Sequence, residues 1–334
     1  MRRFAKIDRF VAIAFPVLCF ACVILLEVPR IPCSSETLIL HGHQSSALEK
    51  FIPMRDFDLD PRQAFSPVVE YSWSAQDMSK RTTLLSNSIG GGENVTVVYF
   101  ITPTYYNPAQ WVNVIRLGQT LMNDPLIYWI VVEDAVNCTL RIRKWLESSG
   151  MMYAHLAANS PPKSEKGGPR GVNQRNRALD LVETLPDGVV YFGDDDNAYD
   201  LRLFPELRKT QRVSVFNIAF VAAGMYERCA VNKTTGEVAK IISNWQGGRK
   251  FPMDMGGWGF HSHVIKTRKP RFRNEVTPGF LEEDFMKQVA NSTSELQPLN
   301  SNCTRIYTWH VKTGGVTTAK VTSDPDFEKL KGLI

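Results

Sequence analysis

The stretch VVYFGDDDNAYD, residues 189–200, decides the fold. Its apolar start is typical of a buried β-strand. Three carboxylates follow at once, Asp194, Asp195 and Asp196. Adjacent like charges repel, so they must be solvated or neutralised. Mg2+ or Mn2+ would neutralise them, because hard divalent cations take carboxylate oxygens. A solvated acidic turn explains this stretch equally well when it is taken alone.

The composition of the chain is that of an ordinary globular protein. Of its 334 residues, 43% are hydrophobic and 22% are charged, which is enough for one large domain or two medium ones. The formal net charge of +5 is mild for this length. Basic residues do not form a stripe with interleaved aromatic residues, so we expect no nucleic-acid partner.

An uncharged run at residues 10–26, FVAIAFPVLCFACVILL, predicts a transmembrane signal anchor. Four basic residues precede it, so residues 1–9 are predicted to be a cytosolic tail and the rest to be luminal. A cleaved signal peptide is the alternative. The run is short, which suits the thinner membranes of the early secretory pathway. Residues 27–93 have poor periodicity and scattered prolines, and we interpret them as a stem.

Sequons and cysteines fit a luminal route without proving it. Cys33, Cys138, Cys229 and Cys303 lie outside the apolar run; they permit disulfides, but their pairing does not follow from the sequence. The candidate N-glycosylation sites are Asn94, Asn137, Asn232, Asn291 and Asn302.

Strand and helix patterns alternate in the chain from residue 94. This order of β-α-β-α-β-α-β predicts a doubly wound α/β layer. Neither GxGxxG after the first strand nor GxxxxGK[ST] is present, so a Rossmann dinucleotide site or a P-loop is not expected. The predicted strands are residues 95–101, 126–132, 152–156 and 189–192. The predicted helices are one with Asn107 as its cap and Pro108 as its first residue, one near Leu140 and one near Val172.

Other polar groups are predicted to reach the same edge of the sheet as the three aspartates. Tyr105 follows the first strand and Asp134 the second, so the two could stack on a base and bond its edge. Arg170 and Arg175 lie where a helix begins, which is sensible if an anion occupies that end. A turn with a partly buried tyrosine and a solvated basic loop are the plain alternatives.

Several motifs together resemble one enzyme family. ITPTY, VVEDA, PRGV-x-QRN, VVYFGDDDN and the late NCT and WH resemble the β-1,3-glucuronosyltransferases of glycosyltransferase family 43, in family order from about residue 97 to 312. The resemblance implies a GT-A nucleotide-sugar transferase fold, α/β with a mainly parallel central sheet, after one N-terminal transmembrane helix. The catalytic domain would span residues 94–334, with a donor half at about 94–200 and an acceptor half at about 201–334. The resemblance also implies Mn2+, a Golgi type II membrane protein and a homodimer.

The resemblance assigns the donor side. Asp196 would be the direct Mn2+ ligand, Asp195 the ribose contact and Asp194 the contact to the transferred sugar. Arg175 would hold the glucuronate carboxylate, for which its planar fork is suited. The remaining UDP-glucuronate contacts would come from Pro103, Tyr105, Asp134, Arg170, His310 and Lys312. At this last position vertebrate members usually carry arginine, so a lysine here puts that contact in doubt.

The resemblance also assigns the acceptor side and the base. Glu227, Arg249 and Asp254 match positions that hold the acceptor galactose, and Trp245 offers a face for a sugar ring or packs in the core. Glu282 aligns with the catalytic base, and burial would raise its pKa toward the working pH. Glu283 and Asp284 leave that assignment uncertain by one position.

The implied reaction is inverting transfer of glucuronic acid from UDP-glucuronate to the 3-hydroxyl of a terminal β-galactose. The acceptor could be a proteoglycan linkage glycan or an N-acetyllactosamine-type glycoprotein end. Two alternatives stay open at this point: the same fold using another UDP-sugar, and a non-catalytic, glycan-binding membrane protein.

Overall fold

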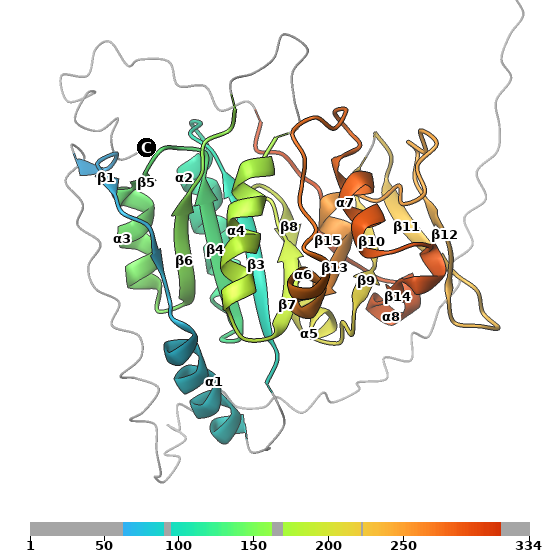
Figure 1. Cartoon of the computed structure of the whole chain (residues 1–334), viewed down its shortest axis with the longest axis horizontal. Helices are drawn as coiled ribbons and strands as arrows, with labels where there is room; N and C mark the ends of the chain where they lie inside the picture. The colour runs from blue at the N-terminus through green and yellow to red at the C-terminus, as the bar shows by residue number, and fades with distance from the viewer. Residues whose placement is uncertain (1–62, 90–94, 162–169, 222, 315–334) are drawn as a thin grey trace, which may run out of the picture. The chain divides into compact units, whose positions relative to one another are not determined.

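The computed structural model describes residues 63–89, 95–161, 170–221 and 223–314 (Figure 1). The predicted cytosolic tail and signal anchor lie outside these ranges, as do Cys33 and Asn94. Among the helices within the described ranges, none has the length and apolarity to cross a bilayer. The assignment of residues 1–26 to a tail and anchor therefore stays a prediction.

A sheet of eight strands forms the centre of the fold, in the order β14-β9-β13-β7-β3-β4-β6-β2. The four consecutive strands β7, β3, β4 and β6 are parallel, and β13 and β2 are antiparallel to their neighbours, so the sheet is mixed around a parallel core. The strands are β2 Tyr71–Ser72, β3 Val97–Thr104, β4 Ile127–Glu133, β6 Met152–Ala157, β7 Gly188–Phe192, β9 Val213–Val215, β13 Trp258–His261 and β14 Gln297–Pro298.

Helices cover both faces of the parallel strands. One core packs α2 Gln110–Leu121 and α3 Leu140–Ser149 against Val98 and Phe100 of β3, and the other packs α4 Val172–Thr184 against Tyr99 and Ile101. Successive β3 side chains point to opposite faces and both faces are covered, which is why the strand is mostly apolar and almost entirely buried. In Figure 1, α4 lies on the viewer's side of the sheet. The predicted doubly wound α/β layer is confirmed.

The predicted boundaries are right to within a few residues, with two instructive differences. β3 continues through Thr104, because its last residues pair with β4 after β7 has ended at Phe192. The helix predicted to have Asn107 as its cap and Pro108 as its first residue begins at Gln110 instead. The Asn107 side chain accepts a hydrogen bond from the Ala109 amide and so caps the turn before the helix.

A second sheet carries the later part of the chain, in the order β12-β11-β10-β15-β8. It consists of β8 Ala198–Tyr199, β10 Asn217–Ala219, β11 Tyr226–Val231, β12 Val238–Ile242 and β15 Ile306–Trp309. A disulfide between Cys229 and Cys303 fastens it across 74 residues of sequence, a pairing that the sequence left open. Cys138 is a buried free thiol.

Residues on both sides of the predicted boundaries share these sheets. β1 Pro67–Val68 pairs with β5 Cys138–Thr139, and β2 pairs with β6, so this part of the predicted stem segment joins the folded unit. The central sheet likewise takes strands from both predicted halves. The remaining elements are α1 Ala75–Ile89, α5 Leu203–Leu207, η3 Met255–Gly257, α6 Ser262–Arg268, α7 Leu281–Val289, η4 Thr293–Glu295 and α8 Asn300–Cys303.

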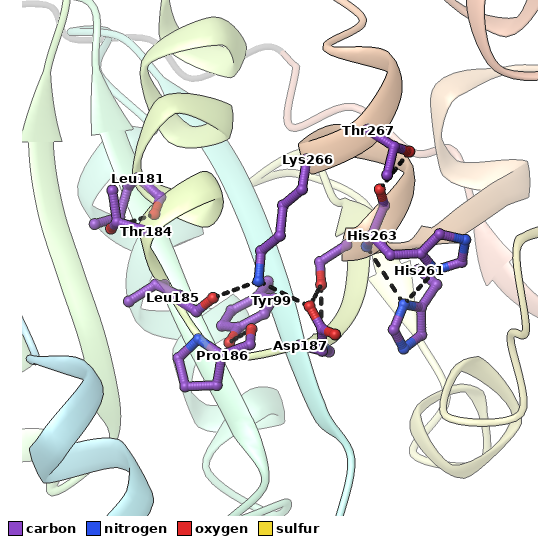
Figure 2. Close-up of polar contacts among 12 residues, drawn as sticks. Tyr99, Leu181, Thr184, Leu185, Pro186, Asp187, His261, His263, Lys266 and Thr267 are labelled. Atoms are coloured by element: carbon purple, nitrogen blue, oxygen red, sulfur yellow. Dashed lines mark hydrogen bonds and ion pairs between the residues drawn. The ribbon is translucent and has the colours of Figure 1, made fainter.

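The amino end of β7 is held by polar contacts to α6 (Figure 2). The Lys266 Nζ donates to the Leu185 carbonyl oxygen and to the Asp187 carboxylate, each at 2.8 Å. The Gly188 amide donates to the Ser262 Oγ at 3.1 Å. These contacts fix where β7 starts, and hence where the three aspartates emerge at its other end.

Candidate active site

Tyr105, Asp134 and residues 194–196 of the predicted donor side lie at the carboxyl edge of the parallel strands. The chain winds from β3 to β4 to β6 in one direction and then returns to place β7 on the other side of β3. Tyr105 directly follows β3, and residues 194–196 follow β7 after a single glycine. Open α/β sheets bind ligands at such a reversal of strand order, because the loops diverge there and leave a crevice.

The three aspartates differ in their partners. Asp194 forms an ion pair with Arg175 at 3.0 Å. Asp195 is only 8% exposed and accepts one hydrogen bond from the Thr104 Oγ1 at 2.7 Å. Asp196 is partly exposed, and no lysine, arginine or histidine in the described residues forms an ion pair with it. The cluster therefore carries more negative charge than its neighbours neutralise.

Burial makes this charge costly. Desolvation raises the pKa of Asp195 to about 7, with Asp196 and Asp194 adding to the shift. The pKa of Asp196 is also raised, first by burial and then by the Asp194 charge. A hard divalent cation would reverse both effects, so these residues fit the predicted metal.

Backbone contacts hold the acidic turn in place. The Tyr199 hydroxyl donates to the Asp194 carbonyl oxygen at 2.9 Å, and the Arg116 Nη2 donates to the Asp196 carbonyl oxygen at 2.7 Å. A Cβ at Gly193 would lie 2.2 Å from the Phe100 ring, so only glycine allows the turn to leave the sheet here. The aspartate side chains are thus oriented by contacts that leave most of their oxygens unused.

The predicted nucleotide contacts lie on the loops after β3 and β4. Tyr105 is 52% exposed, which leaves its ring available for stacking, and Pro103 is partly buried within β3. The Asp134 carboxylate accepts hydrogen bonds from the Ser160 amide at 2.7 Å and the Ser160 Oγ at 2.6 Å. Ser160 was not predicted, and no motif around it marks it; only the fold brings it to Asp134.

The two arginines at the start of α4 occupy different environments. Arg175 is buried; its Nη1 donates to the Arg170 carbonyl oxygen at 2.9 Å, and its Nε has no hydrogen-bond partner among the described residues. The Arg170 side chain is exposed. Gly171, with φ +73°, lies against the Arg175 guanidinium, where a Cβ would clash. A buried cation with an unused donor beside Asp194 is suited to a carboxylate ligand.

Three consecutive acids begin α7, and their surroundings separate them. Burial, with help from the Asp254 charge, raises the pKa of Glu282 to about 7. Glu283 instead accepts hydrogen bonds from the Lys250 and Phe251 amides at 3.0 and 2.6 Å and pairs with Lys287. Asp284 pairs with Arg273. Glu282 alone among the three acids of this described turn forms no ion pair.

Charged groups from both the donor side and the acceptor side shift the pKa of Glu282. Asp254 and Asp194 both raise the pKa of Glu282, and Arg175 opposes them. Asp254 is itself largely buried, and its pKa is raised by burial first and then lowered in part by His310. The His310 Nδ1 lies 3.7 Å from the Asp254 carboxylate, too far for a hydrogen bond, and is buried without a partner among the described residues.

The predicted acceptor residues form two groups. Glu227 is buried, and its carboxylate accepts from the Ser243 Oγ and the Asp254 amide, each at 2.6 Å, so it fixes the loop that carries Asp254. Trp245 is 39% exposed, with the Arg249 guanidinium 4.1 Å from its ring centroid. The tryptophan is therefore partly exposed and is not a packed core residue.

Lys312 and the candidate glycosylation sites lie on the surface. Lys312 follows β15 and is exposed, whereas the neighbouring Thr313 donates to the Asn113 side chain at 2.7 Å. The exposed sequon asparagines within the described ranges are Asn137, Asn232, Asn291 and Asn302.

Comparisons with known proteins identify the family. A family model described as glycosyltransferase family 43 matches residues 117–314. A rat protein named galactosylgalactosylxylosylprotein 3-beta-glucuronosyltransferase 1 is 34% identical over 297 residues, covering 83% of this chain and 88% of that protein. The chain belongs to glycosyltransferase family 43. The predicted family is confirmed.

Other relatives of this family 43 chain carry the same enzyme name. The fly protein galactosylgalactosylxylosylprotein 3-beta-glucuronosyltransferase S is 37% identical over 65% of this chain, which spans 53% of the fly protein. The nematode protein galactosylgalactosylxylosylprotein 3-beta-glucuronosyltransferase sqv-8 is 35% identical, and the match covers 65% of this chain and 64% of the nematode protein. The solved structure of S. aureus TarS aligns with 16% identity and a TM-score of 0.41, over 65% of this chain and 37% of TarS.

A second group of residues whose side chains can bind metals lies on β4, β5 and β6. Glu133, Cys138 and His155 are buried, with their ligand atoms within 4.8 Å of one another. The Arg143 Nε donates to the His155 Nδ1, so the Nε2 carries the proton and donates to Glu133 at 2.6 Å. Burial raises the pKa of the Cys138 thiol to about 12. A protonated nitrogen, a thiol and an adjacent guanidinium do not suit a cation, so this group is a hydrogen-bond network.

Proposed function

We propose that this family 43 glycosyltransferase transfers glucuronic acid from UDP-glucuronate to the 3-hydroxyl of a terminal β-galactose, with inversion. One observation carries the proposal: Glu282, whose pKa burial raises to about 7, shares its surroundings with Asp194 and Arg175 of the donor side and Asp254 of the acceptor side. A general base works best when its pKa is near the working pH. The relatives' names support galactosylgalactosylxylose as the acceptor end.

In the proposed reaction, the Glu282 carboxylate takes the proton of the acceptor hydroxyl. The hydroxyl oxygen forms a bond to the anomeric carbon of the donor sugar, while the bond from that carbon to the UDP oxygen breaks and UDP leaves with the electron pair. Attack from the face opposite UDP converts an α-linked donor into a β-linked product. No covalent intermediate forms, so one base is enough.

The surrounding residues orient the two substrates. Arg175 binds the glucuronate carboxylate through its unused Nε, and the ion pair with Asp194 holds its guanidinium in place. Trp245 stacks on the acceptor sugar, and Asp254 bonds its hydroxyls, held there by Glu227. Tyr105 stacks on uracil, and Asp134 bonds the base edge in an orientation set by Ser160.

Mn2+ is the proposed metal, with Asp196 as its direct ligand. The raised pKa of Asp196 and the absence of a cationic partner in the described part of the chain support a hard divalent ion there. When bound, such an ion offsets the negative charge that develops on a diphosphate leaving group. The Asp196 carboxylate must be ionised to bind it.

We further propose a Golgi location, with a type II anchor at residues 10–26 and the catalytic domain in the lumen. The disulfide between Cys229 and Cys303 supports an oxidising compartment, and the exposed sequons are accessible to glycosylation there. A homodimer is proposed from the family resemblance.

A donor screen tests the proposed activity. The detergent-solubilised full chain is incubated with Mn2+, a β-galactose-terminated acceptor and UDP-glucuronate, UDP-glucose or UDP-N-acetylglucosamine. We expect turnover with UDP-glucuronate, and Arg175→Lys should reduce the preference for it over UDP-glucose, because lysine lacks the bidentate fork. Turnover with UDP-glucose alone would support the use of another donor. Failure to turn over or hydrolyse any donor would support a glycan-binding protein.

A further inference from the structure

The end of β6 leads into the loop that orients Asp134. Residues 158–160 follow Ala157, the last residue of β6, and the amide and hydroxyl of Ser160 donate to the Asp134 carboxylate. Asp134 and Ser160 are both exposed, so burial does not fix their positions. Hydrogen bonds elsewhere on this loop therefore decide where the Asp134 carboxylate lies.

The helix α4 holds one side of the loop. The Asn173 side chain donates to the Asn159 carbonyl oxygen, and the Gln174 side chain donates to the Ala158 carbonyl oxygen, each at 2.5 Å. Both contacts satisfy carbonyl oxygens. The backbone amides of the same residues need acceptors from other parts of the chain.

Glu70 is the acceptor at the end of β6. Successive amides of an extended chain point in opposite directions. The Ala158 amide donates to the Glu133 carbonyl oxygen of β4 at 3.0 Å, so the Ala157 amide points away from β4. On that side β2 pairs with earlier residues of β6 and does not reach Ala157. The Glu70 Oε1 accepts from this amide in place of a strand, at 2.9 Å.

The same carboxylate is bound to α4. The Arg177 Nε and Nη2 donate to the two Glu70 oxygens, so the contact is bidentate. Burial would raise the pKa of Glu70, but the hydrogen bonds from Arg177 and Ala157 lower it, and the side chain is charged at neutral pH. The pair is partly exposed and adds little to stability. Its main effect is therefore to hold the end of β6 against the helix.

The backbone on both sides of Glu70 is fixed as well. β1 pairs with β5, and β2 pairs with β6 (Figure 1). Between β1 and β2 the Arg143 Nη2 donates to the Val69 carbonyl oxygen. We call residues 67–72 the strap. Because β5 follows the loop of Asp134 and β6 precedes the loop of its partner, the strap contacts both loops that meet at this carboxylate.

We propose that Glu70 is a positioning residue of the donor site, which fixes residues 157–160 so that Ser160 orients Asp134 toward the base of the nucleotide. The inference rests on the proposed function, in which Asp134 bonds the edge of uracil. Uracil offers an N3–H donor to a carboxylate, whereas cytosine offers a lone pair at the same atom. The choice of base thus depends on the strap, which the sequence predicted to be stem.

Nucleotide binding to the detergent-solubilised full chain tests this role. UDP and CDP are titrated calorimetrically with Mn2+ present, and the readout is the ratio of the CDP to the UDP dissociation constant. The wild-type ratio should be at least about ten, because only uracil completes the hydrogen bond to Asp134. Glu70→Ala should lower the ratio at least about threefold, since the Ala157 amide loses its acceptor. A general loss of structure would weaken both nucleotides and leave the ratio intact.

Two further variants separate the amide contact from charge and stability. Glu70→Gln keeps an oxygen for the Ala157 amide and should keep at least about half of the wild-type ratio. Glu295→Ala is the matched control, because Glu295 also accepts from a backbone amide and pairs with an arginine. It lies in η4, beside β14 at the opposite end of the sheet from β2, and should leave the ratio unchanged. Equal losses in Glu70→Gln and Glu70→Ala would overturn the proposal.

A double variant tests whether Glu70 acts through Asp134. Asp134→Ala removes the base contact and should bring the ratio to about one. Adding Glu70→Ala should then change the ratio no further, because coupled residues are not additive. A further fall would mean that Glu70 acts elsewhere. If Glu70→Ala does not fold, Arg177→Ala decides, since it frees the Glu70 carboxylate and should lower the ratio at least about twofold; an unchanged ratio would reject the role.

The positioning role and the proposed function can fail separately. A high wild-type ratio that Glu70→Ala leaves intact rejects the positioning role alone. A wild-type ratio near one rejects Asp134 as the base contact and the role of Glu70 with it, even if glucuronic acid is transferred. If no sugar is transferred, but Glu70→Ala lowers the ratio and Glu295→Ala does not, the role of Glu70 stands without the proposed activity.

Discussion

At its amino end β7 is preceded by Asp187, and at its carboxyl end it is followed by the three aspartates of the candidate site. Asp187 accepts hydrogen bonds from the Lys266 Nζ and the Ser262 Oγ, and the Lys266 contact lowers its pKa (Figure 2). Asp195 has one hydrogen bond, from Thr104, and burial raises its pKa to about 7. The pKa of an aspartate is thus lowered at one end of β7 and raised at the other.

The difference has opposite consequences for stability. The pKa of Asp187 is lowered on folding. The stability that Asp187 contributes is therefore fully present at a pH above its pKa in the unfolded state, and it is lost as the pH falls through its pKa in the folded state. The pKa of Asp195 is raised, so the folded state loses stability as the pH rises from the unfolded value toward about 7. An acid with a cationic partner serves the fold, whereas a buried acid without one is explained by a ligand.

The same contrast occurs between two neighbours on α7. Glu283 fixes the loop at Lys250 and Phe251. Its hydrogen bonds, first with Lys287 and then with the Lys250 and Phe251 amides, lower its pKa despite burial. The pKa of Glu282 is raised by the burial and the negative charges around it. One helical step therefore separates a structural carboxylate from a candidate base.

The largest effect is expected from Glu282→Gln. Without a base, kcat should fall by at least about a hundredfold, while the dissociation constant for UDP stays within about threefold. Single-turnover kinetics and UDP titration measure the two quantities. Asp284→Asn, in the same turn of α7 but bonded to Arg273, is the matched control and should keep kcat within about threefold. Equal losses in both variants would mean that α7 only supports the fold.

The pH profile should show the next largest effect. Glu282 must be ionised to accept a proton, so kcat/KM should fall about tenfold for each pH unit below its pKa of about 7 and level off above it. Because the Asp254 charge raises that pKa, Asp254→Asn should move the acid limb to lower pH. The readout is the position of the limb, which is independent of the overall activity of the variant. A shift of the acid limb to higher pH in Asp254→Asn would contradict this account.

Asp195→Asn should increase stability while it abolishes activity. At about pH 8 and with EDTA present, the substitution removes a buried charge and should raise the free energy of unfolding by roughly 1–3 kcal/mol. Urea titration measures the change. The gain should vanish near pH 4, where the aspartate is protonated in the folded protein. Destabilisation at the higher pH would show that the charged form is needed by the fold itself.

Asp187→Asn should have the smallest effect and the opposite sign. The pair with Lys266 is partly exposed, so its loss should cost only about 0–1 kcal/mol at neutral pH. Urea titration of both variants under the same conditions compares the two ends of β7 directly. Activity should be unchanged, since these groups lie at the amino edge of the sheet. The structural carboxylate Glu283 gives the reference. If Asp187→Asn lowered the free energy of unfolding by more than Glu283→Gln does, the expected small effect at the amino end of β7 would be wrong.

Much of the fold could be predicted because its signals are local. The apolar runs of β3, β4 and β7 and the start of α4 need only neighbouring residues, and the boundaries agree within a few positions. The helix after β3 was placed too early because Asn107 and Pro108 read as a cap, although Asn107 caps the preceding turn. The length of β3 depends on β4, which local patterns do not reveal.

The candidate site divides in the same way. Residues 194–196 stand out by their own charge, and their place after a strand is visible in the sequence. Ser160, which holds Asp134, carries no such signal. Glu227 is predicted to hold an acceptor sugar, and only the structure reveals that its oxygens also accept hydrogen bonds from Ser243 and Asp254 within the fold.

By itself the sequence determined the alternation of strands and helices, the three acids at the end of a strand, and the resemblance to family 43, because adjacent residues carry these signals. Only the tertiary structure decided that β7 lies beside β3, that Cys229 bonds to Cys303, and that Glu282 and not Glu283 is the unpaired acid. Burial and hydrogen-bond partners depend on residues far away in the sequence. These two properties decide which carboxylates are paired within the fold and which remain available to bind a ligand.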